Sequence, residues 1–274
     1  MSSILNNSSA NVALATLKDV NRSLNDTQTR VSSGLKVSSG KDNAAYFAIS
    51  ETMKGDSGMF KAINEGMTST KNSVATARLG AETVSDLAQQ MVERIAFAQS
   101  DGVNKADVQA ELDALSANMQ TAIDQATFNG DDLVGAASST VTVVSGISRA
   151  GGTFAATTMT FDTVDLQAIQ TALAAVDVTD GGAMDAKLVA AEAQLDASIT
   201  AATSMGVAEK ALEGQMEFID SLTDTLDSGV SSMVDADMEQ EAARLQALQV
   251  QQQLATQSLS IANRAPQNVL SLFR

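Results

Sequence analysis

The chain has 274 residues and a formal net charge of −16, with no His, Cys or Trp and only 3% aromatic residues. Without His and Cys it lacks the usual general base, the thiol nucleophile and the commonest metal ligands, which argues against an enzyme. The scarcity of aromatic residues and the single Pro favour close-packed long helices over a compact core filled by aromatic rings.

Acidic residues are concentrated in the middle of the chain. Residues 43–241 carry a net charge of −21, residues 1–42 a net +2 and residues 242–274 a net +3. An acidic middle argues against nucleic-acid binding and keeps an assembly soluble, while the weakly basic ends are the parts expected to be buried in it. No stretch approaches the roughly eighteen apolar residues of a membrane helix. The start lacks the basic and apolar regions of a cleaved signal peptide, which by itself predicts a cytoplasmic protein.

The first predicted helix has residues on one side at alternating spacings of four and three. They are Ala10, Leu14, Leu17, Asn21, Leu24, Gln28, Val31 and Leu35. Heptad spacing of this kind places them along one seam of a helix that packs against another helix. The next segment, 44–72, contains Gly55, Gly58 and Gly66, each costing roughly 1 kcal/mol of helix stability relative to Ala. Local sequence therefore predicts that the helix breaks there.

Two more helical stripes follow. The first consists of Val74, Ala77, Ala81, Val84, Ala88, Met91, Ile95 and Ala98. It stops before Gly102, which is well placed to terminate a helix. The second consists of Val108, Leu112, Leu115, Met119, Ala122 and Ala126 and ends before Asn129-Gly130. Both stripes predict helices in a bundle.

The pattern changes after residue 137. Residues 138–144 and 157–161 alternate and are rich in β-branched side chains, with Gly151-Gly152 between them, so they predict a hairpin or two short strands. A short helix at 166–176 and a turn at 180–182 follow.

The longest stripe predicts a helix of about 46 residues, or about 70 Å. Its members are Leu188, Ala191, Leu195, Ser198, Ala202, Met205, Glu209, Leu212, Met216, Ile219, Thr223, Leu226, Val230 and Met233. The polar members Ser198, Glu209 and Thr223 are expected to fix the register of the bundle.

The C-terminal helix has two apolar stripes on different faces. One consists of Leu245, Leu248, Gln252, Ala255, Leu259 and Ala262. The other consists of Ala243, Ala247, Val250, Leu254 and Ile261. A helix that is apolar on two faces needs neighbours on two sides. The N-terminal helix can cover one face, so the other predicts contact with further copies of the chain.

Motifs that could carry chemistry have simpler explanations. Residues 34–42 superficially resemble a phosphate-binding loop, but the spacing is one residue too long and Asp42 stands where Ser or Thr should bind magnesium. Asp131-Asp132 and Asp235-Ala236-Asp237 lie beside predicted helix ends, where Asp caps a helix more often than it binds a metal. No loop has the acidic pattern of a calcium site. We therefore expect no cofactor and no metal.

Four segments resemble conserved parts of bacterial flagellins. They are Arg-Val-Ser-Ser-Gly-Leu-Lys-Val-Ser-Ser-Gly-Lys-Asp-Asn-Ala-Ala at 30–45, Thr-Phe-Asn-Gly at 127–130, Asp-Ala-Asp at 235–237, and the closing run at 262–274. The resemblance covers roughly 1–134 and 184–274, and it is to the short flagellins of alphaproteobacteria such as Caulobacter. Asn43 replaces the usual Asp, and Tyr46-Phe47 replace a small residue and a Leu.

The resemblance implies a subunit that polymerises into the helical flagellar filament used for motility. The fold would be mainly α, a long antiparallel coiled-coil or helix bundle formed by both chain ends, with a small β-hairpin region in the middle. The helix would also run unbroken through 44–72. Three parts are implied: inner-tube terminal helices at 1–44 with 235–274, an outer helical bundle at 45–134 with 184–234, and a small solvent-facing β-containing segment at 135–183.

Self-assembly is expected to depend on apolar residues of the two terminal helices. They are Leu14, Leu17, Leu24, Val31, Leu35, Leu245, Leu248, Val250, Leu254, Leu259, Ile261, Leu270 and Phe273. The resemblance further implies an extracellular protein, exported without a cleaved signal peptide, which overrides the cytoplasmic prediction. Its partners would be further copies of itself, with or without other flagellins, the hook-associated and cap proteins and the flagellar export apparatus, but no nucleic acid and no membrane.

Two other functions stay open. A hook–filament junction protein shares the terminal-helix plan but would not polymerise alone. A coiled-coil signalling or adaptor protein would explain the heptads but not the four motifs. Only a filament subunit should propagate itself, so polymerisation separates the three.

Overall fold

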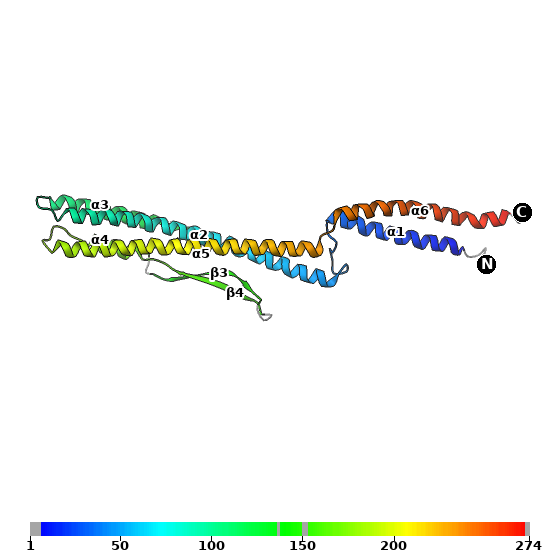
Figure 1. Cartoon of the computed structure of the whole chain (residues 1–274), viewed down its shortest axis with the longest axis horizontal. Coiled ribbons are helices and arrows are strands. Elements are labelled where there is room, and N and C mark those ends of the chain that lie inside the picture. Colours follow the sequence, from blue (N-terminus) through cyan, green and yellow to red (C-terminus); the bar gives the residue numbers. More distant parts are fainter. Residues whose placement is uncertain (1–6, 136–137, 150–152, 272–274) are drawn as a thin grey trace. The chain divides into compact units, whose positions relative to one another are not determined.

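The computed structural model describes residues 7–135, 138–149 and 153–271, with the side chains described up to residue 264 (Figure 1). Its elements are α1 (Ser8–Ser33), α2 (Ala44–Phe97), α3 (Lys105–Gln125), β1 (Thr127–Phe128), β2 (Asp131–Asp132), β3 (Thr140–Ser148), β4 (Ala155–Asp162), α4 (Leu166–Ala174), α5 (Met184–Val234) and α6 (Met238–Ser271). They form two compact units. The terminal unit comprises residues 1–57 and 225–274, and the central unit comprises residues 58–224.

The prediction of a mainly helical fold with a small β region is confirmed. The predicted break at 44–72 is wrong, because α2 continues through Gly55, Gly58 and Gly66, as the flagellin resemblance implies. The local cost of each glycine is offset by packing on the same helix, where Phe60 and Met67 are buried. Tertiary contacts therefore override a local propensity here.

The core of the central unit follows the heptad stripes closely. All eight predicted α2 residues from Val74 to Ala98 are at most 1% exposed, and no member of the stripes on α3 and α5 is exposed. Small Ala and unbranched Met side chains let long helices pack closely without aromatic rings. The packing is tight at Gly80, where an added Cβ would lie 2.4 Å from the Cβ of Ala126.

Polar side chains also join α2 to α5 in the central unit, at regular intervals. We call these pairs the polar ladder: Asn64–Asp220 at 2.5 Å, Lys71–Glu213 at 2.9 Å and Arg78–Glu209 at 2.6 Å. The α2 members are seven residues apart, and so are Asp220 and Glu213 on the antiparallel α5. For the third pair, the α5 position seven residues before Glu213 is Gly206, which has no side chain, so Arg78 pairs with Glu209 instead. The ladder therefore aligns the two helices as a heptad repeat would.

The three polar residues expected to fix the register of α5 behave differently from one another. Glu209 does so, because it pairs with Arg78. Ser198 instead donates to the carbonyl of Leu195 on its own helix at 2.7 Å. The buried Thr223 hydroxyl has no hydrogen-bond partner among the described residues.

Side chains cap the starts of several helices. Asn7 accepts from the Ala10 amide, and Asn43 accepts from the Tyr46 amide at 3.1 Å. Asn is as good a cap as Asp, so the departure from the flagellin pattern at Asn43 keeps this function. Asp237 caps α6 as predicted, accepting from the Glu239 amide at 3.1 Å.

The capping prediction for Asp131-Asp132 is wrong. These residues form β2, which pairs with β1 across a turn in which Asn129 and Gly130 both have positive φ. Asp132 accepts from two backbone amides within its own turn, and Asp131 accepts from the Ser73 hydroxyl at 3.3 Å. Their carboxylates therefore hold a tight hairpin against α2.

The predicted hairpin at 138–161 is confirmed as the antiparallel pair β3–β4, whose register runs from Thr140 opposite Asp162 to Ser148 opposite Ala155. A bulge interrupts it between Val144 and Gly146. The Gly151-Gly152 turn lies outside the described residues.

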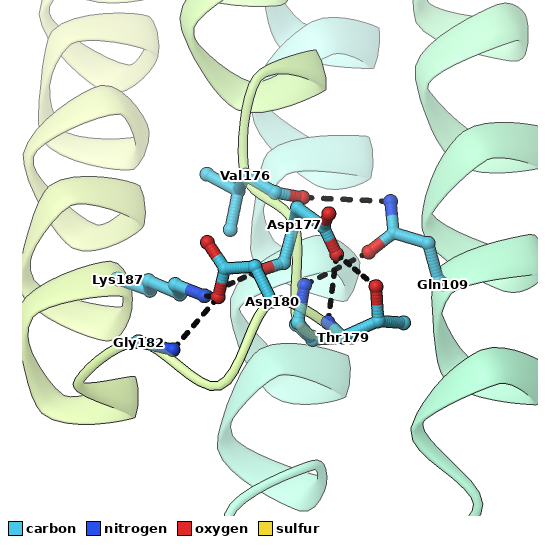
Figure 2. A network of polar contacts seen from close by, with 8 residues as sticks. Gln109, Val176, Asp177, Thr179, Asp180, Gly182 and Lys187 are labelled. Atoms are coloured by element: carbon cyan, nitrogen blue, oxygen red, sulfur yellow. Dashed lines mark hydrogen bonds and ion pairs between the residues drawn. The ribbon is translucent and has the colours of Figure 1, made fainter.

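A polar network closes the loop between α4 and α5 (Figure 2). Lys187 of α5 bonds to the Asp177 carbonyl and the Asp180 carboxylate, while Gln109 of α3 accepts from the Val178 amide at 2.9 Å. Hydrogen bonds from Lys187 and from a backbone amide lower the pKa of Asp180. Gly181, with φ of 70°, makes the turn predicted at 180–182.

Candidate self-assembly surface

Helices α1 and α6 of the terminal unit form an antiparallel pair. Arg30 lies 3.4 Å from Glu241 near one end of the pair. The Gln252 side chain donates to Asn21 at 2.7 Å in the middle, and the Asn7 side chain donates to the carbonyl of residue 262 at 2.8 Å. The paired residue numbers change in opposite directions along the chain, so the two ends of the chain are aligned in a single register.

One apolar stripe of α6 faces α1. Leu248 and Ala255 are 8% and 9% exposed, and Leu245, Gln252, Leu259 and Ala262 are half-buried. On α1, Leu17, Leu24 and Val31 are half-buried as well. This interface is narrow, because α1 has only one fully buried residue in the described chain, Thr27.

The second apolar stripe of α6 is exposed along its whole length. Val250, Leu254 and Ile261 are 56%, 58% and 71% exposed, and Ala243 and Ala247 are exposed too. We call these five residues the outer stripe. α6 therefore has two apolar faces, and α1 covers only one of them. A row of large apolar side chains on a helix surface indicates an interaction site.

The helix around the outer stripe carries no charge. Residues 245–263 contain no Asp, Glu, Lys or Arg, and the nearest charges in sequence are Arg244 and Arg264. The remaining exposed positions are mostly Gln, Ser and Thr. Burying this face against another protein would therefore desolvate no charged group, which is the main cost of burying a polar helix.

The start of α1 adds two exposed apolar residues. Val12 is 67% exposed, and Leu14, a predicted seam residue, is 40% exposed. Gln28 was expected in the seam but is exposed, and its neighbour Thr27 is buried instead. A straight helix of 3.6 residues per turn drifts away from a strict seven-residue repeat, so the inward position moves by one residue.

Leu35 has a different position from the other predicted assembly residues. It forms a backbone bridge with Asp235, and the amides of Lys36 and Val37 donate to the Val234 carbonyl. Leu35 packs on the buried cluster of Val37, Val230 and Val234. It therefore fastens the segments that follow α1 and precede α6.

The segment 34–42 is a closed turn. The amides and hydroxyls of Ser38 and Ser39 all bond to one carboxylate oxygen of Asp42, at 3.0–3.1 Å. These bonds, led by the Ser38 amide, lower the pKa of Asp42. The amide and hydroxyl donors of Ser38 and Ser39 therefore bind a carboxylate of the chain itself.

Two predicted assembly residues lie partly or wholly outside the described part of the chain. Leu270 belongs to α6, but its side chain lies outside the described part, and Phe273 lies outside the described residues.

Within the described chain, no helix has the length and apolar character needed to cross a membrane, and no three acidic side chains gather as a metal site would require.

Sequence reasoning missed the polar ladder, although its signal is present. Lys71 and Arg78 are seven residues apart, as are Glu213 and Asp220, with opposite charge on the two helices. A search for complementary charges at heptad spacing on two predicted helices could have found it.

Comparison with known proteins gives matches over nearly the whole chain. Residues 4–140 match the bacterial flagellin N-terminal helical region, and residues 188–273 match the bacterial flagellin C-terminal helical region. A flagellin of Brucella melitensis is 36% identical over 284 residues, covering all of both chains. Flagellin FljM of Caulobacter vibrioides is 33% identical over 281 residues, covering 100% of this chain and 99% of the relative. Flagellin A of Rhizobium meliloti is 29% identical over 395 residues, covering all of both chains.

Among solved structures, the chain resembles a flagellar hook-associated protein from Vibrio parahaemolyticus with a TM-score of 0.54. The likeness covers 71% of this chain and 100% of that chain at 12% identity. At this identity the likeness concerns the fold alone.

Proposed function

Because the chain belongs to the bacterial flagellin family and is a subunit of the flagellar filament outside the cell, we propose that its terminal unit makes the contacts that build the filament. The observation that carries this proposal is the outer stripe of α6, an uncharged apolar face that α1 leaves uncovered. Burying such a face between copies is a favourable driving force for polymerisation.

We assign the inner tube to residues 1–44 with 235–274. The antiparallel α1·α6 pair supports this assignment, because one apolar stripe of α6 faces α1 while the outer stripe stays exposed. The assembly residues proposed on it are Leu14, Val250, Leu254 and Ile261 for contacts between copies. Leu17, Leu24, Val31, Leu245, Leu248 and Leu259 are proposed to hold the pair itself together, with Leu35 fastening its base; Leu270 and Phe273 stay assigned by sequence alone.

We assign the outer shell to residues 45–134 with 184–234, and the surface to 135–183. The buried stripes and the polar ladder of the central unit support a self-contained helical bundle in the shell. The exposure of β4 and the excess of acidic residues support a surface that faces water.

We also propose that the chain leaves the cell through the flagellar export apparatus without a cleaved signal peptide, and that it contacts the hook-associated and cap proteins at the filament ends. The absence of Cys supports passage in an unfolded state, because no wrong disulfide can form on the way. A core of Ala, Leu and Met with few aromatics is compatible with refolding at the tip.

Seeded growth tests the assignment. Purified monomer is added to short sheared filaments and observed by negative-stain electron microscopy, and we expect long uniform tubes. Deleting 1–35 or 242–274 should abolish growth while the helices of 45–234 stay folded by circular dichroism. Filaments from either deletion would refute the assignment to the terminal unit. Full-length chains that never elongate seeds would instead favour a hook–filament junction protein, which has the same terminal-helix plan.

A further inference from the structure

The β3–β4 ribbon of the central unit has one edge against the helices and one edge in solvent. On the inner side, Gln215 of α5 donates to the Ser145 carbonyl at 2.8 Å, and Val143, Ser145 and Gly146 are buried. On the outer side, six of the eight β4 residues are exposed and the other two are half-buried. Figure 1 shows the ribbon beside α5, with β4 on the far side of β3.

The outer edge of β4 lacks the features that normally protect an edge strand. Within the described residues β4 pairs only with β3. Proteins usually guard such an edge with Lys, with Pro or with a bulge that twists it away. The β4 sequence Ala-Ala-Thr-Thr-Met-Thr-Phe-Asp contains neither Lys nor Pro, and the bulge of the ribbon lies in β3. Its single charge is Asp162, at one end.

We propose that this edge is a homotypic interaction surface, to which a second copy of the chain adds its own β4 in the antiparallel direction. An added strand satisfies the outward backbone N–H and C=O groups of both copies at once. An antiparallel pair of identical strands is self-complementary about a two-fold axis. The Thr163 amide donates to the Ser139 carbonyl, so alternate residues of β4 from Thr163 face β3, and Thr158 directs its backbone groups outward. The axis therefore passes through Thr158, at the middle of β4, and places each Thr158 opposite its counterpart.

Charge placement selects the antiparallel arrangement. Asp162 lies at one end of β4, where it accepts from Thr140 at 2.7 Å. At the other end, the Arg149 guanidinium lies over the Phe154 ring, 5.6 Å from its centroid. Antiparallel pairing brings each Asp162 to the Arg149 end of the other copy. Parallel pairing in register would place two Asp162 carboxylates about 5 Å apart, which is unfavourable.

The charge of the central unit makes this association depend on salt. Residues 58–224 contain eight basic and twenty-three acidic residues, a net charge of −15. Two such units repel each other, and the repulsion is screened over about 10 Å at 0.1 M salt but about 3 Å at 1 M. We expect the β4 contact to strengthen as salt increases.

Single cysteines test the contact in the full-length chain, because the natural sequence has none. Thr158→Cys places two thiols directly opposite each other on the same face of the paired strands, with about 5.5 Å between their Cα atoms, a separation that a disulfide allows. Ala155→Cys places its thiol about 20 Å from its counterpart in the antiparallel pair. Thr171→Cys, on the exposed face of α4, measures crosslinking by random collision. All three positions are exposed, so the fold should tolerate the changes.

We expect Thr158→Cys to form disulfide-linked dimers at least tenfold faster than Thr171→Cys in 0.5 M salt, with Ala155→Cys no faster than Thr171→Cys. Equal rates for Thr158→Cys and Ala155→Cys would overturn the antiparallel arrangement. A Thr158→Cys rate no higher than that of Thr171→Cys would overturn the surface altogether.

A charge at the edge gives a second readout. Thr158→Lys should abolish the salt-dependent dimer in sedimentation velocity, while Thr171→Lys should keep it. Seeded growth of the same variants separates this proposal from the filament function, because the terminal unit is unchanged in both. If the Thr158→Cys chain elongates seeds but forms no β4 crosslink, the β4 contact is refuted and the filament function stands. If the unaltered chain fails to elongate seeds, the filament assignment is refuted and the β4 contact is not affected.

Discussion

Replacing Leu254 with Ala tests whether the outer stripe of α6 is buried between copies. The residue is 58% exposed within one chain. Full burial of a Leu side chain is worth about 1.5–3 kcal/mol, so covering the exposed remainder contributes about 0.9–1.7 kcal/mol. A factor of ten in an equilibrium corresponds to about 1.4 kcal/mol, so the critical concentration for filament growth should increase by roughly 4- to 16-fold.

The assay measures the monomer concentration left in solution when seeded filaments stop growing. Ala is a better helix former than Leu, so Leu254→Ala should leave the helical circular dichroism of the monomer unchanged. Gln253→Ala is the matched control, because Gln253 is exposed beside the stripe but outside it. Leu248→Ala, at the inner seam, should instead weaken the α1·α6 pair, as Leu248 is only 8% exposed. An unchanged critical concentration for Leu254→Ala, or an equal rise for Gln253→Ala, would refute the contact.

Three further predictions concern stability. Gly80→Ala should destabilise the central unit by about 1–3 kcal/mol in denaturant unfolding, because its methyl group would lie 2.4 Å from the Cβ of Ala126. Gly66→Ala has nothing within 4 Å of the added methyl group and should stabilise the unit by up to about 1 kcal/mol. Equal effects of the two changes would contradict the close packing at Gly80. Lys71→Glu should lower the stability of the central unit only slightly, because the pair with Glu213 is partly exposed. Adding Glu213→Lys should restore most of the lost stability in a double-mutant cycle. The pKa of Asp42 is lower in the folded chain than in the unfolded chain, so its carboxylate stabilises the fold above the unfolded pKa of about 3.9. This stabilisation is lost as the pH falls through the folded pKa, so the melting temperatures of the natural chain and of Asp42→Asn should converge as the pH falls from about 4. A constant difference between the two melting temperatures would refute this role of Asp42.

The helical core could be predicted because its signal repeats. Each stripe offers six or more residues at heptad spacing, so a single polar or glycine exception does not obscure the inward face. The two faces of α6 could be read in the same way, since Leu248 and Leu254 belong to different stripes and are buried and exposed respectively. Which protein covers the exposed face does not follow from one chain's periodicity.

What failed depended on contacts distant in sequence or on turn geometry. The break predicted at Gly55 and Gly58 follows from local propensity, whereas α2 is held by packing with residues more than a hundred positions away. Asp131 and Asp132 were predicted to be caps because they lie beside a predicted helix end. The dipeptide before them, Asn129-Gly130, is the usual signal for a tight hairpin turn, and the structure forms that turn. Attention to that dipeptide would have corrected the prediction.

The polar ladder has a consequence for insertions and deletions. Each pair of the polar ladder joins one position of α2 to one position of α5. Because the two helices are antiparallel, a step of seven residues forward in α2, from Asn64 to Lys71, matches a step of seven residues back in α5, from Asp220 to Glu213. Residues added between the two helices, in the loops or in the β3–β4 ribbon, leave every rung intact. One residue added inside either helix turns all later side chains by about 100° and breaks the ladder beyond that point. We therefore expect this chain to tolerate changes of length in the loops and the ribbon between α2 and α5, but not inside the two helices.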